Sequence, residues 1–161
     1  MYELAAETAD DRWEVEALYD TCFAPGRTAL SSYRLREGVP PVAGLSLVAR
    51  DELGILAGAI RFWPVTVAGL DVLLLGPVAA HPTRQGEGLG GLLIQTSMEL
   101  AGPQGWERVM LVGDAPYYGR YGFLVLHDVV MPPPTNPERV LGRALRGGAW
   151  DGVAGEVMRT R

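Results

Sequence analysis

The chain has 161 residues, of which 48% are hydrophobic and 20% charged, enough apolar material for one globular domain spanning residues 1–161. Its net charge of −5 argues against non-specific nucleic-acid binding, and no run of about 18 apolar residues predicts a membrane span. All 14 basic residues are arginines, which excludes mechanisms that need a phosphate-loop, Schiff-base or general-base lysine.

Cysteine and histidine are too sparse in the sequence for a disulfide or a metal site. Cys22 is the only cysteine, and His81 and His127 show no metal-ligand spacing with it. A lone cysteine agrees with a reducing compartment, and the start MYELAAETADD lacks the basic and apolar regions of a signal peptide. We therefore expect a cytoplasmic protein that uses no metal and contacts neither nucleic acid nor membrane.

The first third of the chain predicts a strand, a helix and a loop. Residues 2–7 are typical of a short strand, and residues 10–23 of a helix with Asp10 or Asp11 as its cap. The residues that fall at helical spacing and predict its buried face are Trp13, Ala17, Leu18 and Cys22. Residues 24–41 form a loop that has room for one helix.

Three extended runs separated by short turns come next and predict antiparallel hairpins. They are residues 44–51, 55–67 and 70–82. Within the third run, Pro77 follows Gly76 and removes a donor from the strand ladder. The proline indicates either an edge strand or a bulge, and we favour a bulge that splays this strand away from its next parallel neighbour.

The rest of the chain predicts a helix, a buried strand and a second antiparallel part. The helix ends at Gly102-Pro103, and its predicted buried face consists of Leu89, Leu92, Leu93, Thr96 and Leu100. Residues 108–114 form a buried strand, and a strand–helix–strand crossover makes the two strands parallel. Residues 117–123 form a helical turn, and residues 124–132 and 139–147 complete the antiparallel part.

The segment HPTRQGEGLGGLLIQ, residues 81–95, has four glycines in six positions and suggests a phosphate-binding loop of one of three kinds. A P-loop is excluded, because Leu92-Leu93 stand where a lysine and a hydroxyl residue are required. A dinucleotide-binding loop starts at the end of its strand, whereas five residues precede Gly86 here and the upstream strands are antiparallel. The third kind of phosphate-binding loop has the pattern Gln-x-x-Gly-x-Gly, which residues 85–90 match.

This pattern resembles the acetyl-CoA pyrophosphate loop of the GNAT superfamily of N-acetyltransferases. The segment DAPYYGRYGF, residues 114–123, resembles the second signature of that family, an aromatic-Tyr-x-x-x-Gly-Phe stretch. The order of elements resembles the family over essentially the whole chain. The resemblance implies an α/β (α+β) fold with a mixed, largely antiparallel central sheet, whose parallel central strands splay apart between flanking helices. It also implies acetyl-CoA as co-substrate.

The resemblance assigns the residues that would hold acetyl-CoA. The pyrophosphate would lie on the glycine loop, with Arg84 nearby, and the pantetheine arm would pair with strand residues 78–80, one of whose N–H groups would polarise the thioester carbonyl. An uncapped, glycine-rich helix start suits an anion. Glu87 departs from the often basic residue of the family, so we expect its side chain in solvent. The expected cofactor-binding residues are Val78, Ala79, Ala80, Arg84, Gln85, Gly86, Glu87, Gly88, Leu89, Gly90 and Gly91.

The resemblance also places the catalytic groups. Tyr118 aligns with the signature tyrosine, and a phenol with a pKa near ~10 can protonate a thiolate with a pKa near ~8.5. Tyr117 is the neighbour most easily confused with it. The strand before the loop offers no glutamate as general base, so Asp114 is the nearest candidate, acting through water. His81 and Cys22 are better explained as structural residues.

The acceptor side is the least defined part of the expectation. In the family the segment after the first helix covers it, and the residues we expect there are Phe23, Arg27 and Tyr33. The acceptor would be a primary amine on a small molecule or on a protein, and the family often forms homodimers. The alternative function is a non-catalytic acyl-CoA-binding sensor or interaction domain, against which the combination of Tyr118 and an intact loop argues.

Overall fold

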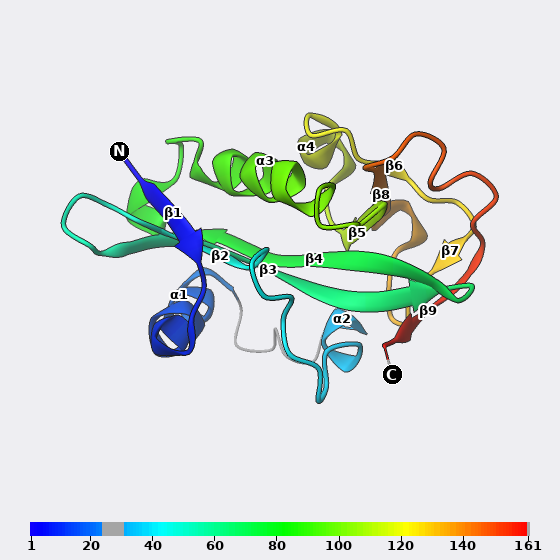
Figure 1. Ribbon diagram of the computed structural model, residues 1–161, viewed down its shortest axis with the longest axis horizontal. Coiled ribbons are helices and arrows are strands. Elements are labelled where there is room, and N and C mark those ends of the chain that lie inside the picture. Colours follow the sequence, from blue (N-terminus) through cyan, green and yellow to red (C-terminus); the bar gives the residue numbers. More distant parts are fainter. Residues whose placement is uncertain (24–30, 161) are drawn as a thin grey trace.

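The computed structural model describes residues 1–23 and 31–160, and it places a mixed β-sheet between two layers of helix (Figure 1). Helices α3 (Leu89–Ala101) and α4 (Ala115–Gly119) lie on one face of the sheet. Helices α1 (Arg12–Cys22) and α2 (Ser31–Arg34) lie on the opposite face.

The sheet has the strand order β1-β2-β3-β4-β5-β8-β6, and β9 pairs with both β3 and β7. The strands are β1 Glu3–Ala6, β2 Leu47–Arg50, β3 Leu56–Val67, β4 Leu70–Ala80, β5 Arg108–Val112, β6 Leu124–Val125, β7 Val129–Val130, β8 Val140–Ala144 and β9 Gly155–Arg159. The pairs β4–β5 and β7–β9 are parallel, and the other pairs are antiparallel. The predicted fold class, largely antiparallel with parallel central strands, is confirmed.

The long hairpin β3–β4 forms the middle of the sheet. Its turn is Ala68-Gly69, and both residues have positive φ angles, 52° and 78°. This conformation is the one that matches the twist of a two-residue hairpin. The turn fixes the register from Val67 opposite Leu70 up to Phe62 opposite Leu75. This register breaks between Ile60 and Phe62.

Helix α3 packs on the sheet through a face rotated from the predicted one. Leu89 and Leu93 are buried as expected, but Leu92 and Leu100 are 42% and 39% exposed and Thr96 is half-buried. The other buried positions are Gly91, Ile94, Ser97, Met98 and Ala101. Small residues let a helix lie close to a sheet, so the buried face follows size as well as hydrophobicity. The predicted face was therefore wrong in three of its five members.

Helix α1 differs from the prediction in the same way. Trp13 is 86% exposed, and the buried residues are Val15, Leu18 and Tyr19. A tyrosine can be buried when its hydroxyl has an acceptor, and Tyr19 donates to the carbonyl oxygen of Pro77 at 3.1 Å. Asp11 is the N-cap residue, but its side chain makes no hydrogen bond to the helix.

Strand β9 was not among the predicted elements. It extends the sheet along Val65–Val67 of β3, and Val157 is its buried residue. A five-residue strand with one buried side chain gives almost no alternation of buried and exposed residues to detect.

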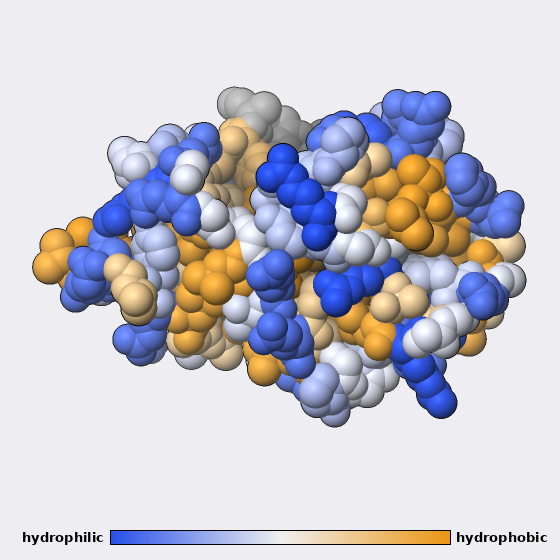
Figure 2. All heavy atoms as spheres, turned by 90° about the horizontal axis from the view of Figure 1, so that it is seen from above, coloured by the Kyte–Doolittle hydropathy of each residue, from blue (hydrophilic) through white to orange (hydrophobic). Residues whose placement is uncertain are grey.

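The face of the molecule seen from above mixes hydrophilic and hydrophobic residues (Figure 2). Within the described ranges, no helix has the length and apolar character that crossing a membrane requires.

Candidate functional site

A bulge in β4 lies at Gly76-Pro77. Ile60 pairs with Val78 and Phe62 with Leu75, so two residues of β4 stand opposite one residue of β3. The Gly76-Pro77 peptide bond is cis. The predicted bulge is confirmed.

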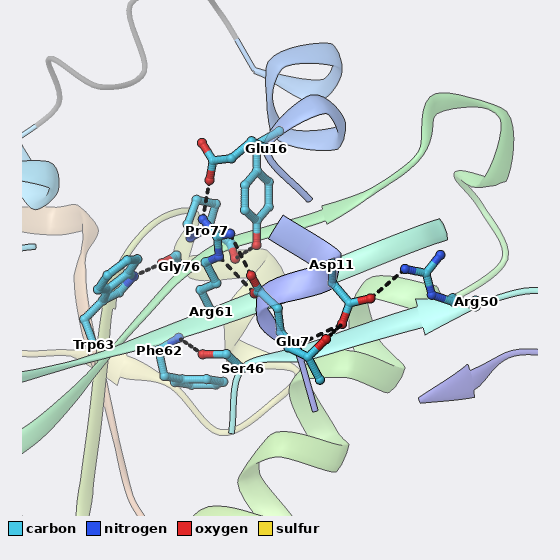
Figure 3. Close-up of polar contacts among 12 residues, drawn as sticks. Glu7, Asp11, Glu16, Ser46, Arg50, Arg61, Phe62, Trp63, Gly76 and Pro77 are labelled. Carbon is cyan, nitrogen blue, oxygen red and sulfur yellow. Dashed lines mark hydrogen bonds and ion pairs between the residues drawn. The ribbon is translucent and has the colours of Figure 1, made fainter. Parts of the chain in front are cut away.

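Two buried side chains from other elements hold this bulge. The indole Nε1 of Trp63 donates to the carbonyl oxygen of Gly76 at 2.6 Å, and the Tyr19 hydroxyl donates to the carbonyl oxygen of Pro77. Figure 3 shows the Trp63–Gly76 contact beside Pro77. Because a buried carbonyl without a partner is costly, these bonds stabilise the irregular backbone.

Beyond the bulge, β4 separates from β5. The two strands pair only at Leu73–Val109 and Leu74–Met110, while β5 remains paired with β8 from Arg108 to Val112. Residues 78–80 of β4 pair with β3 on one edge, and within residues 1–23 and 31–160 no strand pairs with them on the edge toward β5. The splayed strands predicted from Pro77 are confirmed, and the open edge exposes backbone groups to a ligand.

The glycine loop leads into α3 without a side-chain cap. Gly88 is the N-cap residue with φ 78°, and no side chain caps the helix there. Gly86 also has a positive φ, 88°, and a Cβ at either glycine would meet no atom within 4 Å. These glycines are needed for backbone conformation, because other residues rarely adopt positive φ. No side chain of the described residues caps the first N–H groups of α3, an arrangement that suits an anion.

At positions 90 and 91 glycine is required for a different reason, which is the close approach of neighbouring tyrosines. A Cβ on Gly90 would lie 3.2 Å from the Tyr117 hydroxyl, and one on Gly91 would collide with the Tyr121 hydroxyl. The rings of Tyr117 and Tyr121 are 5.6 Å apart and belong to the α4 segment. The two glycines therefore let α4 pack directly against the start of α3.

The charged residues of the loop are engaged within the protein. Arg84 forms an ion pair with Asp51, whose side chain is only 4% exposed. Glu87 is exposed, as expected, but it also accepts a hydrogen bond from the Tyr2 hydroxyl. A phosphate that contacted Arg84 would share it with Asp51.

Tyr118 lies where β5 ends. Its ring contacts the backbone of Gly113, directly after β5, and lies 6.0 Å from the Phe123 ring. Burial raises the pKa of Tyr118 above the ordinary value of 10.0, so its hydroxyl is protonated at neutral pH. Burial, followed by a hydrogen bond with Tyr121, raises the pKa of Tyr117 to about 12. The Tyr117 hydroxyl lies beside Gly90 at the start of α3, whereas the Tyr118 ring lies beside Gly113, directly after β5.

Asp114 has a structural role in the same turn. Its carboxylate caps α4 by accepting a 3.0 Å hydrogen bond from the backbone N–H of Tyr117. It lines a cavity of about 640 Å³ together with His127 and Arg139. His81 also acts in a turn, since its Nδ1 accepts from the backbone N–H of Thr83. Cys22 donates its thiol to the Ala80 carbonyl, and burial raises its pKa, which agrees with a structural role.

A second cavity, of about 940 Å³, is lined by residues of α1 and α2 and by Pro77 of the bulge. Tyr33 lines it, whereas Phe23 packs near Tyr19 with ring centroids 6.0 Å apart and is not in the lining. Arg27 lies outside the described residues. Of the three expected acceptor-side residues, the structure brings Tyr33 to this cavity.

The same cavity contains charged residues that sequence reasoning missed. Arg61 binds both carboxylate oxygens of Glu7 and also pairs with Glu16 (Figure 3). Arg36 lies close by, with Trp63 5.1 Å from its guanidinium carbon. No pattern in the sequence distinguishes these arginines from solvated ones. In the described part of the chain, no group of three or more His, Cys, Asp or Glu could hold a metal ion.

Comparison with known proteins agrees with this geometry. Residues 3–123 match the model of the acetyltransferase (GNAT) family. YhbS of Escherichia coli K12, an uncharacterized N-acetyltransferase, is 30% identical over 147 residues, which cover 89% of this chain and 87% of YhbS. YjhQ of the same organism, also an uncharacterized N-acetyltransferase, is 42% identical over 83 residues, 49% of this chain and 45% of YjhQ.

Solved structures show the same fold. The crystal structure of E. coli YhbS in complex with CoA has a TM-score of 0.85 at 28% identity, over 99% of this chain and 89% of that one. A GNAT family acetyltransferase from Brucella melitensis in complex with acetyl-CoA has a TM-score of 0.76 at 26% identity, over 99% and 96% of the two chains. An uncapped glycine loop, splayed central strands and these matches together establish that the chain belongs to the acetyltransferase (GNAT) family of N-acetyltransferases.

Proposed function

We propose that this protein transfers an acetyl group from acetyl-CoA to a primary amine by direct attack of the amine on the thioester. The observation that carries the proposal is the combination of an uncapped α3 start, an open β4 edge and a protonated tyrosine at the end of β5. The structures of relatives in complex with CoA and acetyl-CoA support it.

In this proposal the pyrophosphate binds at residues 85–91, where the positive end of the α3 dipole and free N–H groups favour an anion. The pantetheine arm lies in the gap between β4 and β5 and pairs with the open edge at residues 78–80. One N–H group there donates to the thioester carbonyl oxygen and stabilises its developing charge. Arg84 adds a charged contact from the side of the loop, shared with Asp51.

The reaction forms a bond between the amine nitrogen and the carbonyl carbon and breaks the bond between that carbon and sulfur. Tyr118 donates its phenolic proton to the departing thiolate. Its position after β5 supports this role, and its raised pKa keeps the proton on the phenol at neutral pH.

Asp114 remains our candidate for the base that takes the proton from the amine, through water. Its charge is close enough to Tyr118 to contribute to the raised tyrosine pKa, after burial and the influence of other groups. Its engagement as the α4 cap argues for an indirect role rather than contact with the amine.

The acceptor is an amine on a small molecule or a protein, and it approaches from the 940 Å³ cavity on the other side of the bulge. Residues 1–161 act as one catalytic domain in this proposal. A cytoplasmic location and homodimer formation stay predictions from the sequence. The alternative, a non-catalytic acyl-CoA-binding sensor or interaction domain, requires the same loop but not Tyr118.

The test is release of free thiol from acetyl-CoA in the presence of a panel of primary amines, with identification of the acetylated amine by mass spectrometry. We expect amine-dependent thiol release. Binding of acetyl-CoA in calorimetry without thiol release for any amine would favour the non-catalytic alternative, and absence of acetyl-CoA binding would refute both.

A further inference from the structure

Arg36 is a charged side chain that the mechanism above does not use. It lines the 940 Å³ cavity on the α2 side of the sheet. Its guanidinium carbon lies 4.1 Å from the centroid of the Tyr33 ring and 5.1 Å from that of Trp63. Its Nη2 lies 3.6 Å from the position that a Cβ on Gly76 would take. The guanidinium group is therefore held by two aromatic rings beside the β4 bulge.

No ion pair joins Arg36 to a carboxylate among the described residues. Its Nε and Nη1 atoms are buried and have no hydrogen-bond partner among the described residues. Burial lowers the pKa of Arg36, and Tyr33 opposes that shift through its charge interaction and a hydrogen bond. An arginine retains its proton in spite of such a shift. A buried cation without a carboxylate is expensive, so a partner is expected from outside.

Arg61 shows how the same cavity satisfies an arginine with the protein's own groups. All three of its guanidinium nitrogens donate, Nε and Nη2 to Glu7 and Nη1 to Glu16 (Figure 3). These two glutamates are the acidic residues in the described cavity lining, which also contains Arg12, Arg36 and Arg61. Three arginines against two glutamates leave one positive charge in excess. Arg12 is exposed to solvent, so the buried arginine without a glutamate is Arg36, whose Nε and Nη1 have no hydrogen-bond partner among the described residues.

We propose that Arg36 binds a carboxylate of the acceptor, so that the amine substrate is an amino-acid-like small molecule. This inference rests on the proposed acetyl transfer and names its substrate class. A planar guanidinium pairs well with a carboxylate, and the rings of Tyr33 and Trp63 keep its plane fixed. A lysine side chain or the N-terminus of a protein carries no carboxylate of its own beside its amine. Such an acceptor would leave Arg36 unpaired, whereas a free amino acid would neutralise it.

The test compares each free L-amino acid and ω-amino acid with its own amide as acceptor. The amide keeps the amine and the size of the molecule but removes the negative charge. We expect kcat/KM to favour the carboxylate form by about 30-fold or more, the loss that accompanies removal of one partner from a buried charge pair. Arg36→Gln should bring the ratio between acid and amide close to one, and Arg36→Lys should retain part of it.

Arg12→Gln is the matched control, because Arg12 lines the same cavity but is exposed. An exposed charge is screened by solvent and should change the ratio by less than about 5-fold. The affinity for acetyl-CoA should be unchanged in the Arg36 variants. A wild-type enzyme that accepts amides as well as acids, or an Arg36→Gln variant that keeps the preference, overturns the inference but not the acetyl transfer.

Binding provides a second readout that does not depend on turnover. N-acetylated amino acids, which keep the carboxylate, should bind to the CoA complex in calorimetry, and the corresponding amides should bind at least about 30-fold more weakly. Arg36→Gln should abolish this difference. If acids and amides bind alike, or neither binds, the carboxylate site is refuted. If no amine is acetylated while the binding difference is present, the proposed function fails and the carboxylate site stands.

Discussion

The indole Nε1 of Trp63 donates a 2.6 Å hydrogen bond to the buried carbonyl oxygen of Gly76. This bond joins β3 to the point where β4 leaves its regular register, directly beside Pro77. It therefore connects the acceptor-side cavity with the open edge on which the thioester is proposed to lie.

Trp63→Phe removes this bond and keeps most of the ring. We expect the free energy of unfolding, measured in urea, to fall by about 1–3 kcal/mol, because the Gly76 carbonyl is left buried and unpaired. We also expect kcat to fall, because the bulge is no longer fixed. Trp150→Phe is the control, since the Trp150 indole donates to the Arg143 carbonyl at 3.1 Å, away from the site. A loss of stability in both variants with equal loss of activity would contradict a special role for the bulge.

Gly91→Ala tests the packing of α4 on α3. The new methyl group would collide with the Tyr121 hydroxyl, so we expect a loss of about 1–3 kcal/mol in unfolding free energy. Gly102→Ala is the matched helix-end control, because its Cβ meets no atom within 4 Å. That control should be neutral or stabilise by up to about 1 kcal/mol. Adding Tyr121→Phe to Gly91→Ala should recover part of the loss, and failure to do so would exclude the proposed collision.

Gly88→Asp tests the anion site. It introduces a negative charge at the α3 start, so we expect the affinity for CoA in calorimetry to fall by at least about 10-fold. Gly152→Asp carries the same backbone strain, since Gly152 has φ 71° and Gly88 has φ 78°, and neither Cβ would meet an atom within 4 Å. The two variants should lose similar stability but differ in CoA affinity. Equal affinities would place the pyrophosphate elsewhere.

Tyr118→Phe tests the proton donor. General acid catalysis contributes about 10²–10⁴-fold, and we expect kcat to fall by that order with little change in CoA binding. Tyr117→Phe should have a much smaller effect. Wild-type turnover by Tyr118→Phe, under conditions where chemistry limits the rate, would show that water or another group protonates the thiolate.

The pH profile gives an independent check on the same residue. Burial raises the pKa of Tyr118 above 10.0, so the protonated form persists to higher pH than in free tyrosine. The descending limb of kcat should therefore lie above pH 10 in the wild type. Tyr118→Phe should lack that limb, because it has no phenol to ionise.

Local chemistry made the β4 bulge and the uncapped start of α3 predictable. Pro77 indicated the bulge because a proline cannot donate in a ladder, and the absent cap indicated an open helix start. The face of α1 was not predictable from hydrophobicity, because Tyr19 is buried through its hydrogen bond to Pro77 while Trp13 is exposed. Arg36 was not predictable either. What distinguishes it is that its buried Nε and Nη1 find no hydrogen-bond partner in the part of the chain that the structure describes, a property of the folded surroundings that no spacing in the sequence encodes.

The packing of Tyr117 and Tyr121 against Gly90 and Gly91 sets the distance between the start of α3 and the α4 segment. In the proposed function, the pyrophosphate binds at the start of α3 and the proton donor Tyr118 lies on α4. Because the two helices are in direct contact, we expect the distance between these two groups to suit one length of pantetheine arm. A CoA analogue with one methylene more in the pantetheine arm would be anchored correctly by its phosphates and still present its sulfur out of reach of the proton donor.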